Sequence, residues 1–220
     1  MNEALKQKMR DALDCAAGQV KNLVTSHPDY FPMYTEGGKW KHGGEAWTNW
    51  CEGFLGGQLW LLYLHTGDAW WKEKAEHYCR LIEDRKDDGS VHDLGFLFMP
   101  TWRRWYELTE DRSKQDVVLQ AGRTLSERFQ PAGGYLCSFL GAESLFIDIM
   151  MNVGIIFYTA RQEDDRELWE LALRHSLTTR RYLVRGDEAA WEAMYDMQRQ
   201  YFEDWGMPDP ERQTLLDRME

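Results

Sequence analysis

The feature that most constrains the fold is a helix-stop-helix unit that recurs along the chain. At Thr66-Gly67-Asp68, at Thr109-Glu110-Asp111 and before Asp165, an apolar helical stretch ends and a charged, amphipathic one begins. The units follow one another at intervals of about 40 to 55 residues, which is typical of stacked helical hairpins. Such arrays either curve as an open solenoid or close into an α/α toroid. No long strand alternation is present, so the sequence predicts an all-α chain.

Apolar periodicity and stop signals place the expected helices. They are predicted over 2–25, 46–66, 69–86, 94–108, 112–129, 145–161, 164–184 and 188–204. Residues 29–45 are rich in Gly and aromatic residues, and we expect them to form a loop. Residues 1–220 are expected to form a single domain of helical hairpins, because their number suits one domain.

Composition and charge narrow the classes of function. A net charge of -11 makes nucleic acid an unexpected partner, because binding it needs a basic surface. Neither a signal peptide nor a membrane-spanning apolar run is apparent. The four cysteines have no CxxC spacing, which argues against a zinc or redox motif: Cys15, Cys51, Cys79 and Cys137. These features predict a cytoplasmic protein with reduced thiols, with no membrane association and no metal.

Two aspartates stand out as candidates for chemistry. Asp93 and Asp148 each lie where an inner helix is expected to begin, and the loops that enter these helices should gather on one face. Each is set among apolar residues, and burial raises the pKa of a carboxyl group. A proton donor beside a second carboxylate is what glycoside chemistry usually needs. The alternative for Asp93 is a helix cap. Asn152 follows Asp148 by one helical turn and is placed to hydrogen-bond to it.

Eleven tryptophans are a high count for this length. They suit either a helical core or flat platforms for a sugar ring. Several motifs occur here in the order and spacing found in one enzyme family, over 46–54, 59–68, 92–96, 133–135, 147–152 and 178–185. With these motifs the chain resembles the unsaturated glucuronyl hydrolases, glycoside hydrolase family eighty-eight, over about residues 29–200.

The resemblance implies an (α/α)6 toroid and a cytoplasmic enzyme without metal or organic cofactor. Its substrate would be an oligosaccharide made by a polysaccharide lyase, with an unsaturated uronic acid at the non-reducing end. The enzyme would hydrate the C4=C5 enol ether of that sugar, and the resulting hemiketal would collapse. By resemblance, Asp148 protonates C4 and activates the water, and Asp93 assists. The substrate-binding residues implied are Trp47, His92, Phe139 and Asn152.

The resemblance has two departures. The family carries a His where this chain has Trp191, and residues 201–220 diverge from the family sequence. We therefore expect a toroid that is incomplete at the C-terminus, and one of the explanations left open is a shortened protein whose open ends pair in a homo-oligomer. The alternatives are a truncated or degenerate family member that binds sugar or a protein partner without turnover, and a helical-repeat scaffold for proteins.

Overall fold

The computed structural model describes residues 2–42 and 49–184. The chain divides into two compact units, residues 1–176 and 177–220, and the first contains nearly all of the described elements. Its elements, with α9 running past its boundary, are α1 (Glu3–Ser26), β1 (Pro32–Glu36), β2 (Lys39–His42), η1 (Asn49–Cys51), α2 (Glu52–Thr66), α3 (Ala69–Arg80), η2 (Glu83–Asp87), α4 (Leu94–Phe98), α5 (Trp102–Thr109), α6 (Arg112–Ser126), β3 (Phe129–Gln130), β4 (Tyr135–Leu136), α7 (Ile149–Asn152), α8 (Gly154–Glu163) and α9 (Arg166–Leu183).

The all-α prediction is confirmed, although several helices differ from their expected ranges. The helix expected over 94–108 is divided into α4 and α5 around Pro100, which has no backbone N–H to continue a helix. The helix expected over 145–161 begins only at Ile149 and is divided into α7 and α8. The expected helix over 188–204 and the whole divergent tail lie outside the described residues.

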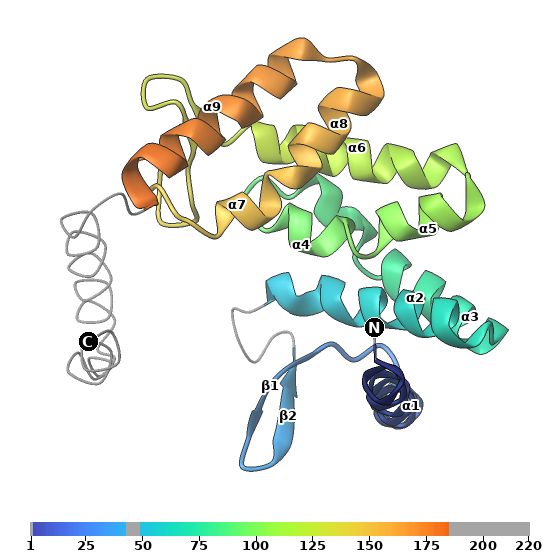
Figure 1. Cartoon of the computed structure of the whole chain (residues 1–220). Helices are drawn as coiled ribbons and strands as arrows, with labels where there is room; N and C mark the ends of the chain where they lie inside the picture. The colour runs from blue at the N-terminus through green and yellow to red at the C-terminus, as the bar shows by residue number, and fades with distance from the viewer. Residues whose placement is uncertain (1, 43–48, 185–220) are drawn as a thin grey trace. The chain divides into compact units, whose positions relative to one another are not determined.

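The loop expected over 29–45 is wrong for its middle part, where β1 and β2 pair as an antiparallel hairpin. Gly37 and Gly38 form the two-residue turn, with φ of 57° and 73°. Two consecutive positive φ angles are what a type I′ turn requires, and glycine adopts them without steric cost. The Gly37-Gly38 pair is therefore a hairpin signal rather than a general loop signal. Figure 1 shows the hairpin of β1 and β2, which follows α1 in the chain.

The predicted helical hairpins are α2–α3, α5–α6 and α8–α9, and all three use the same junction. The first helix of each ends at a residue in the left-handed conformation: Gly67, Glu110 and Asp164. The second helix begins at an aspartate whose side chain accepts a backbone N–H from its first turn: Asp68 from Trp70, Asp111 from Ser113 and Asp165 from Leu168. These bonds satisfy donors that a helix start leaves unpaired. The repeat seen in the sequence is thus a repeat of junction chemistry.

Glu110 adopts the left-handed conformation with a φ of 54° and a side chain that is exposed. A side chain costs roughly 1 kcal/mol in this conformation, a penalty that glycine avoids. We therefore expect Glu110→Gly to raise the free energy of unfolding by up to about 1 kcal/mol, measured by urea denaturation. Gly67→Ala, at the equivalent junction with a φ of 71°, is the control and should lower it. Equal shifts of the same sign in both variants would contradict this account.

The core lies between the hairpins. Helix α2 packs on α3, α6 packs on α8, and the short α4 contacts α2, α6 and α7 (Figure 1). Four tryptophans are buried in this core, as the structural interpretation of the Trp count predicts: Trp60, Trp71, Trp102 and Trp105. All four cysteines are free thiols. Within residues 2–42 and 49–184, none of the helices has both the length and the apolarity for a membrane span.

Candidate active site

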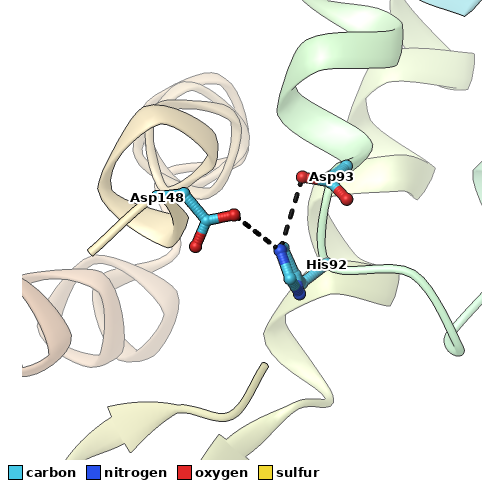
Figure 2. Close-up of side chains that lie close together, drawn as sticks. All are labelled: His92, Asp93 and Asp148. Atoms are coloured by element: carbon cyan, nitrogen blue, oxygen red, sulfur yellow. Dashed lines mark hydrogen bonds and ion pairs between the residues drawn. The ribbon is translucent and has the colours of Figure 1, made fainter. Parts of the chain in front are cut away.

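The structure brings Asp93 and Asp148 together, as the sequence predicts. Asp93 directly precedes α4 and Asp148 directly precedes α7, and these two short helices pack against each other. His92 lies between the two acids (Figure 2): its Nε2 is 3.0 Å from Asp148 Oδ2 and 3.4 Å from Asp93 Oδ1. One ligand atom from each of the three residues lies within 4.8 Å of the others. The two acids and the histidine therefore form one compact cluster, which we call the acid cluster.

Neither aspartate of the acid cluster caps the helix that it precedes. The side chains of Asp93 and Asp148 make no capping hydrogen bond to their helices. By contrast, Asp68 and Asp111 occupy the same position at their helices and do cap them. The alternative interpretation of Asp93 as a helix cap is therefore wrong, and both carboxylates face the cluster instead.

Asp93 is the more buried of the two acids, with 14% of its side chain exposed. Burial raises the pKa of its carboxyl group, and the nearby charge of Asp148 raises it further. His92, the Asn152 amide and Arg128 oppose this by lowering the pKa of Asp93, without cancelling the effect of burial. The expected rise of the pKa at Asp93 is confirmed, and desolvation is its main cause.

Asp148 is more open than its sequence neighbours suggest. Its side chain is 39% exposed, because Ile147 and Met151 point outward and are themselves 46% and 70% exposed. The expectation of a buried Asp148 is therefore wrong. Its Oδ2 accepts a hydrogen bond from His92, whereas its Oδ1 has no partner among the described residues. Asp148 thus has one oxygen fixed and one oxygen unengaged.

His92 is almost fully buried, and its two ring nitrogens have different roles. The backbone N–H of Phe139 donates to Nδ1 at 3.1 Å, so the proton of the neutral ring is on Nε2 and points at Asp148. The Phe139 ring stacks on the imidazole, with centroids 5.6 Å apart and planes 28° apart. A metal-bound histidine normally donates from its second nitrogen, whereas this one accepts there. The acid cluster therefore does not fit a metal ion in this arrangement.

Asn152 is fully buried and contacts Asp93, not Asp148 as expected. Its side-chain amide donates to Asp93 Oδ1 at 3.2 Å, and its side-chain oxygen accepts the Phe96 N–H at 2.9 Å. Both ends of the amide are thus engaged, which fixes its orientation. Through this hydrogen bond, Asn152 holds the Asp93 carboxylate in place. Trp47, the expected sugar platform, lies outside the described residues.

Two residues near the acid cluster were missed by the sequence reasoning. Burial raises the pKa of the Cys51 thiol and the negative charge of Asp93 adds to this, so Cys51 lies within electrostatic reach of the site. Arg128 donates to the backbone oxygens of Gly89, Cys137 and Ser138. Cys51 could have been found, because it falls in one of the family-like motifs at 46–54. Nothing in the sequence marks Arg128, since every residue offers a backbone oxygen.

A second histidine, His175 on α9, supports the strand that leads to Phe139. Its side chain is completely buried, and its Nδ1 accepts the backbone N–H of Leu136 at 3.1 Å. The proton of the neutral ring is then on Nε2, which has no partner among the described residues. Protonation of this ring would disrupt the bond to Leu136 or leave a buried charge unpaired.

We expect this histidine to make the fold sensitive to acid. Burial lowers the pKa of His175 from its ordinary 6.5 to about 4. Folding disfavours the charged ring. The stability that neutral His175 contributes is therefore complete above about pH 6.5 and is lost as the pH falls toward 4. The loss in the free energy of unfolding over this pH range corresponds to about 3 kcal/mol. Urea denaturation across this range should show a smaller loss of stability for His175→Gln than for the unchanged chain. Equal losses would contradict the prediction.

A separate cleft of about 540 Å³ lies along η2, α6 and α8 and contains no member of the acid cluster. Its walls carry two ion pairs, Lys86 with Asp87 and Arg123 with Glu163, and the carboxylate of Asp116. It offers no carboxylate pair with a shared histidine. The acid cluster is therefore the better candidate for catalysis.

Comparison with known proteins relates the chain to one group of enzymes, although no family model matches. The chain is 28% identical over 199 residues to an unsaturated glucuronyl hydrolase of Bacillus sp. (strain GL1), covering 86% of this chain and 52% of that protein. It is 28% identical over 156 residues to an unsaturated chondroitin disaccharide hydrolase of Streptococcus pneumoniae, covering 67% of this chain and 39% of the relative.

Solved structures agree with the sequence comparison. The crystal structure of an unsaturated glucuronyl hydrolase from Streptococcus agalactiae matches with a TM-score of 0.76 and 25% identity, over 83% of this chain and 48% of the other. The predicted α/α-toroid fold class is thereby confirmed. The chain spans about half the length of the curated relatives it matches. In sequence and in fold, the chain is related to the unsaturated glucuronyl hydrolases and corresponds to about half of their length.

Proposed function

We propose that this chain carries the acid cluster of an enzyme that removes an unsaturated uronic acid from the non-reducing end of an oligosaccharide. The observation that carries the proposal is the pair of Asp93 and Asp148 held around His92, in a chain related to unsaturated glucuronyl hydrolases. The substrate is the product of a polysaccharide lyase, since lyases leave a C4=C5 double bond on the terminal uronic acid.

The proposed reaction is hydration of that double bond. Asp148 donates a proton to C4, water adds to the electron-poor C5, and the water returns its second proton to Asp148. The hemiketal formed at C5 then opens and releases the next sugar. The Oδ1 of Asp148 supports this role, because it is buried without a partner among the described residues while Oδ2 is held by His92, which leaves Oδ1 for the substrate.

The spacing of the acids argues against inverting hydrolysis. An inverting glycosidase keeps its carboxyl groups about 6.5–9.5 Å apart to hold a water between them. Here an oxygen of each carboxylate lies within 4.8 Å of the other, and His92 occupies the space between. We assign Asp93 the task of holding the ring and the charge balance. Trp47, His92, Phe139 and Asn152 are proposed as the substrate-binding residues.

Compartment, assembly and domain organisation are part of the proposal. We place the enzyme in the cytoplasm, without cofactor, because imported lyase products would be consumed there. Residues 1–220 would form one α/α-toroid domain, and the chain would associate into a homo-oligomer.

The test uses an unsaturated disaccharide from a chondroitin lyase. The absorbance of its double bond should disappear in the presence of the protein, and in heavy water the released uronic acid should carry one deuterium at C4. Loss of the glycosidic bond without deuterium at C4 would contradict hydration. Calorimetry on the same disaccharide distinguishes the remaining outcomes: binding without turnover would support the alternative of a sugar-binding protein, and absence of both would remove both proposals.

A further inference from the structure

Each of the four residues from Leu136 to Phe139 makes a backbone hydrogen bond with the side chain of a residue elsewhere in the chain. His175 accepts the N–H of Leu136, and His92 accepts the N–H of Phe139. Between them, Arg128 donates from Nε to Cys137 O at 2.9 Å and from Nη2 to Ser138 O at 2.6 Å. This short segment is therefore fixed at both of its ends and in its middle.

Arg128 also connects this segment with the loop that leads to the acid cluster. Its Nη1 donates to the backbone oxygen of Gly89 at 2.5 Å, and Gly89 lies just before His92 in the chain. The guanidinium group thus bonds to carbonyls on both sides of the contact between Phe139 and His92. No carboxylate of the described residues lies within ion-pair distance of Arg128. The hydrogen bonds that its side chain donates go to backbone oxygens. A planar group with several fixed donors is well suited to position backbone in this way.

We propose that Arg128 is a positioning residue that fixes the Phe139 N–H against His92 and thereby keeps the imidazole proton on Nε2, directed at Asp148. Without that N–H, only the carboxylates of Asp148 and Asp93 favour the proton on Nε2, so the share of the Nδ1–H tautomer rises. Nε2 would then present a lone pair to Asp148 Oδ2 at 3.0 Å, which is repulsive. The catalytic consequence of this inference rests on the proposed function, whereas the tautomer itself does not.

The charge of Arg128 has a second effect on the acid cluster. It lowers the pKa of Asp93, against the burial and the Asp148 charge that raise it. The other groups that face Asp93 are His92, the neutral amide of Asn152 and the thiol of Cys51. Removing the cation should therefore raise the pKa of Asp93 further. The limb of the pH–activity profile that the ionisation of Asp93 governs should then move to higher pH.

The test compares Arg128→Lys and Arg128→Met in the full chain labelled with ¹⁵N-histidine. Two-bond proton–nitrogen spectra distinguish the two tautomers, and a His92→Gln variant identifies the His92 signals. We expect the unchanged chain to show the Nε2–H tautomer at His92. Both variants should show a mixture, because neither lysine nor methionine can make the three bonds of the guanidinium. Arg123→Met is the matched control, since Arg123 lies on α6 and, among the described residues, pairs with Glu163 and Gln120, neither of which belongs to the acid cluster.

The outcomes separate this inference from the proposed function. A His92 that stays purely Nε2–H in folded Arg128→Lys or Arg128→Met would overturn the inference, whatever the activity. If the unchanged chain turns over the disaccharide, both variants should lose about tenfold or more in kcat with a smaller change in KM. In that case only Arg128→Met should also shift the pH profile upward, because lysine retains a positive charge. A thermal melt of each variant shows whether it is folded, and Arg128→Lys covers the case in which the methionine variant is not.

Discussion

Asp148→Asn should reduce turnover of an unsaturated disaccharide by about 10²–10⁴-fold, the range over which one general acid–base residue contributes. Asparagine has nearly the same shape, and its side-chain oxygen can still accept the hydrogen bond from His92 Nε2. What it cannot do is give a proton to C4 and take one from water. The loss should therefore appear in kcat, while KM changes little.

The measurement is the decay of the double-bond absorbance under saturating substrate, together with a thermal melt. Glu143→Gln is the matched control, because Glu143 is an exposed acid in the loop that precedes Asp148. It removes the same charge a few residues away and should leave both turnover and stability near their original values. If Asp148→Asn kept more than about a tenth of the activity, the assignment of Asp148 as the proton carrier would be wrong.

The approach of Asp93 and Asp148 could be predicted because it follows from the repeat. Helical hairpins of similar length place the starts of their inner helices on one face, so two acids at such starts converge. The exposure of Asp148 could not be predicted in the same way. Ile147 and Met151 are apolar, yet α7 is a helix of only four residues and cannot bury apolar groups on all sides. Composition around a residue is a poor guide to burial where the helix is that short.

The details of the polar network also lay beyond the sequence. Asn152 is one turn from Asp148 in the chain, but its amide bonds across to Asp93 on another helix. The proton position on His92 depends on a backbone N–H from Phe139, and that of His175 depends on one from Leu136. Backbone donors carry no residue identity, so no sequence pattern reveals them. These contacts, rather than the acids themselves, are what the structure adds to the candidate site.

Gly95→Ala should be strongly destabilising, because Gly95 is where α4 touches α7. A Cβ at this position would lie 2.6 Å from Asn152 Cα and 2.8 Å from the Asn152 backbone oxygen. Backbone atoms cannot rotate away as a side chain can, so the two helices would have to separate. We expect a loss of about 1–3 kcal/mol in the free energy of unfolding, as for other overpacked contacts.

The same separation should impair catalysis beyond the loss of stability. The contact between α4 and α7 holds Asn152 on Asp93 and His92 on Asp148, so moving the helices apart lengthens both hydrogen bonds. Activity measured well below the melting temperature of the variant should therefore still be reduced by about tenfold or more, since small misplacements of reacting groups are costly. Urea denaturation and the absorbance assay give the two quantities on the same preparation.

Gly154→Ala is the matched control for this prediction. Gly154 begins α8, close after α7 in the chain, and a Cβ there would meet nothing within 4 Å. Alanine is the better helix former by roughly 0.5–1 kcal/mol, so this variant should be as stable as the original chain or more so. If Gly95→Ala behaved like Gly154→Ala, the two helices would not be in close contact at Gly95. Another contact would then have to explain how Asp93 and Asp148 are held around His92.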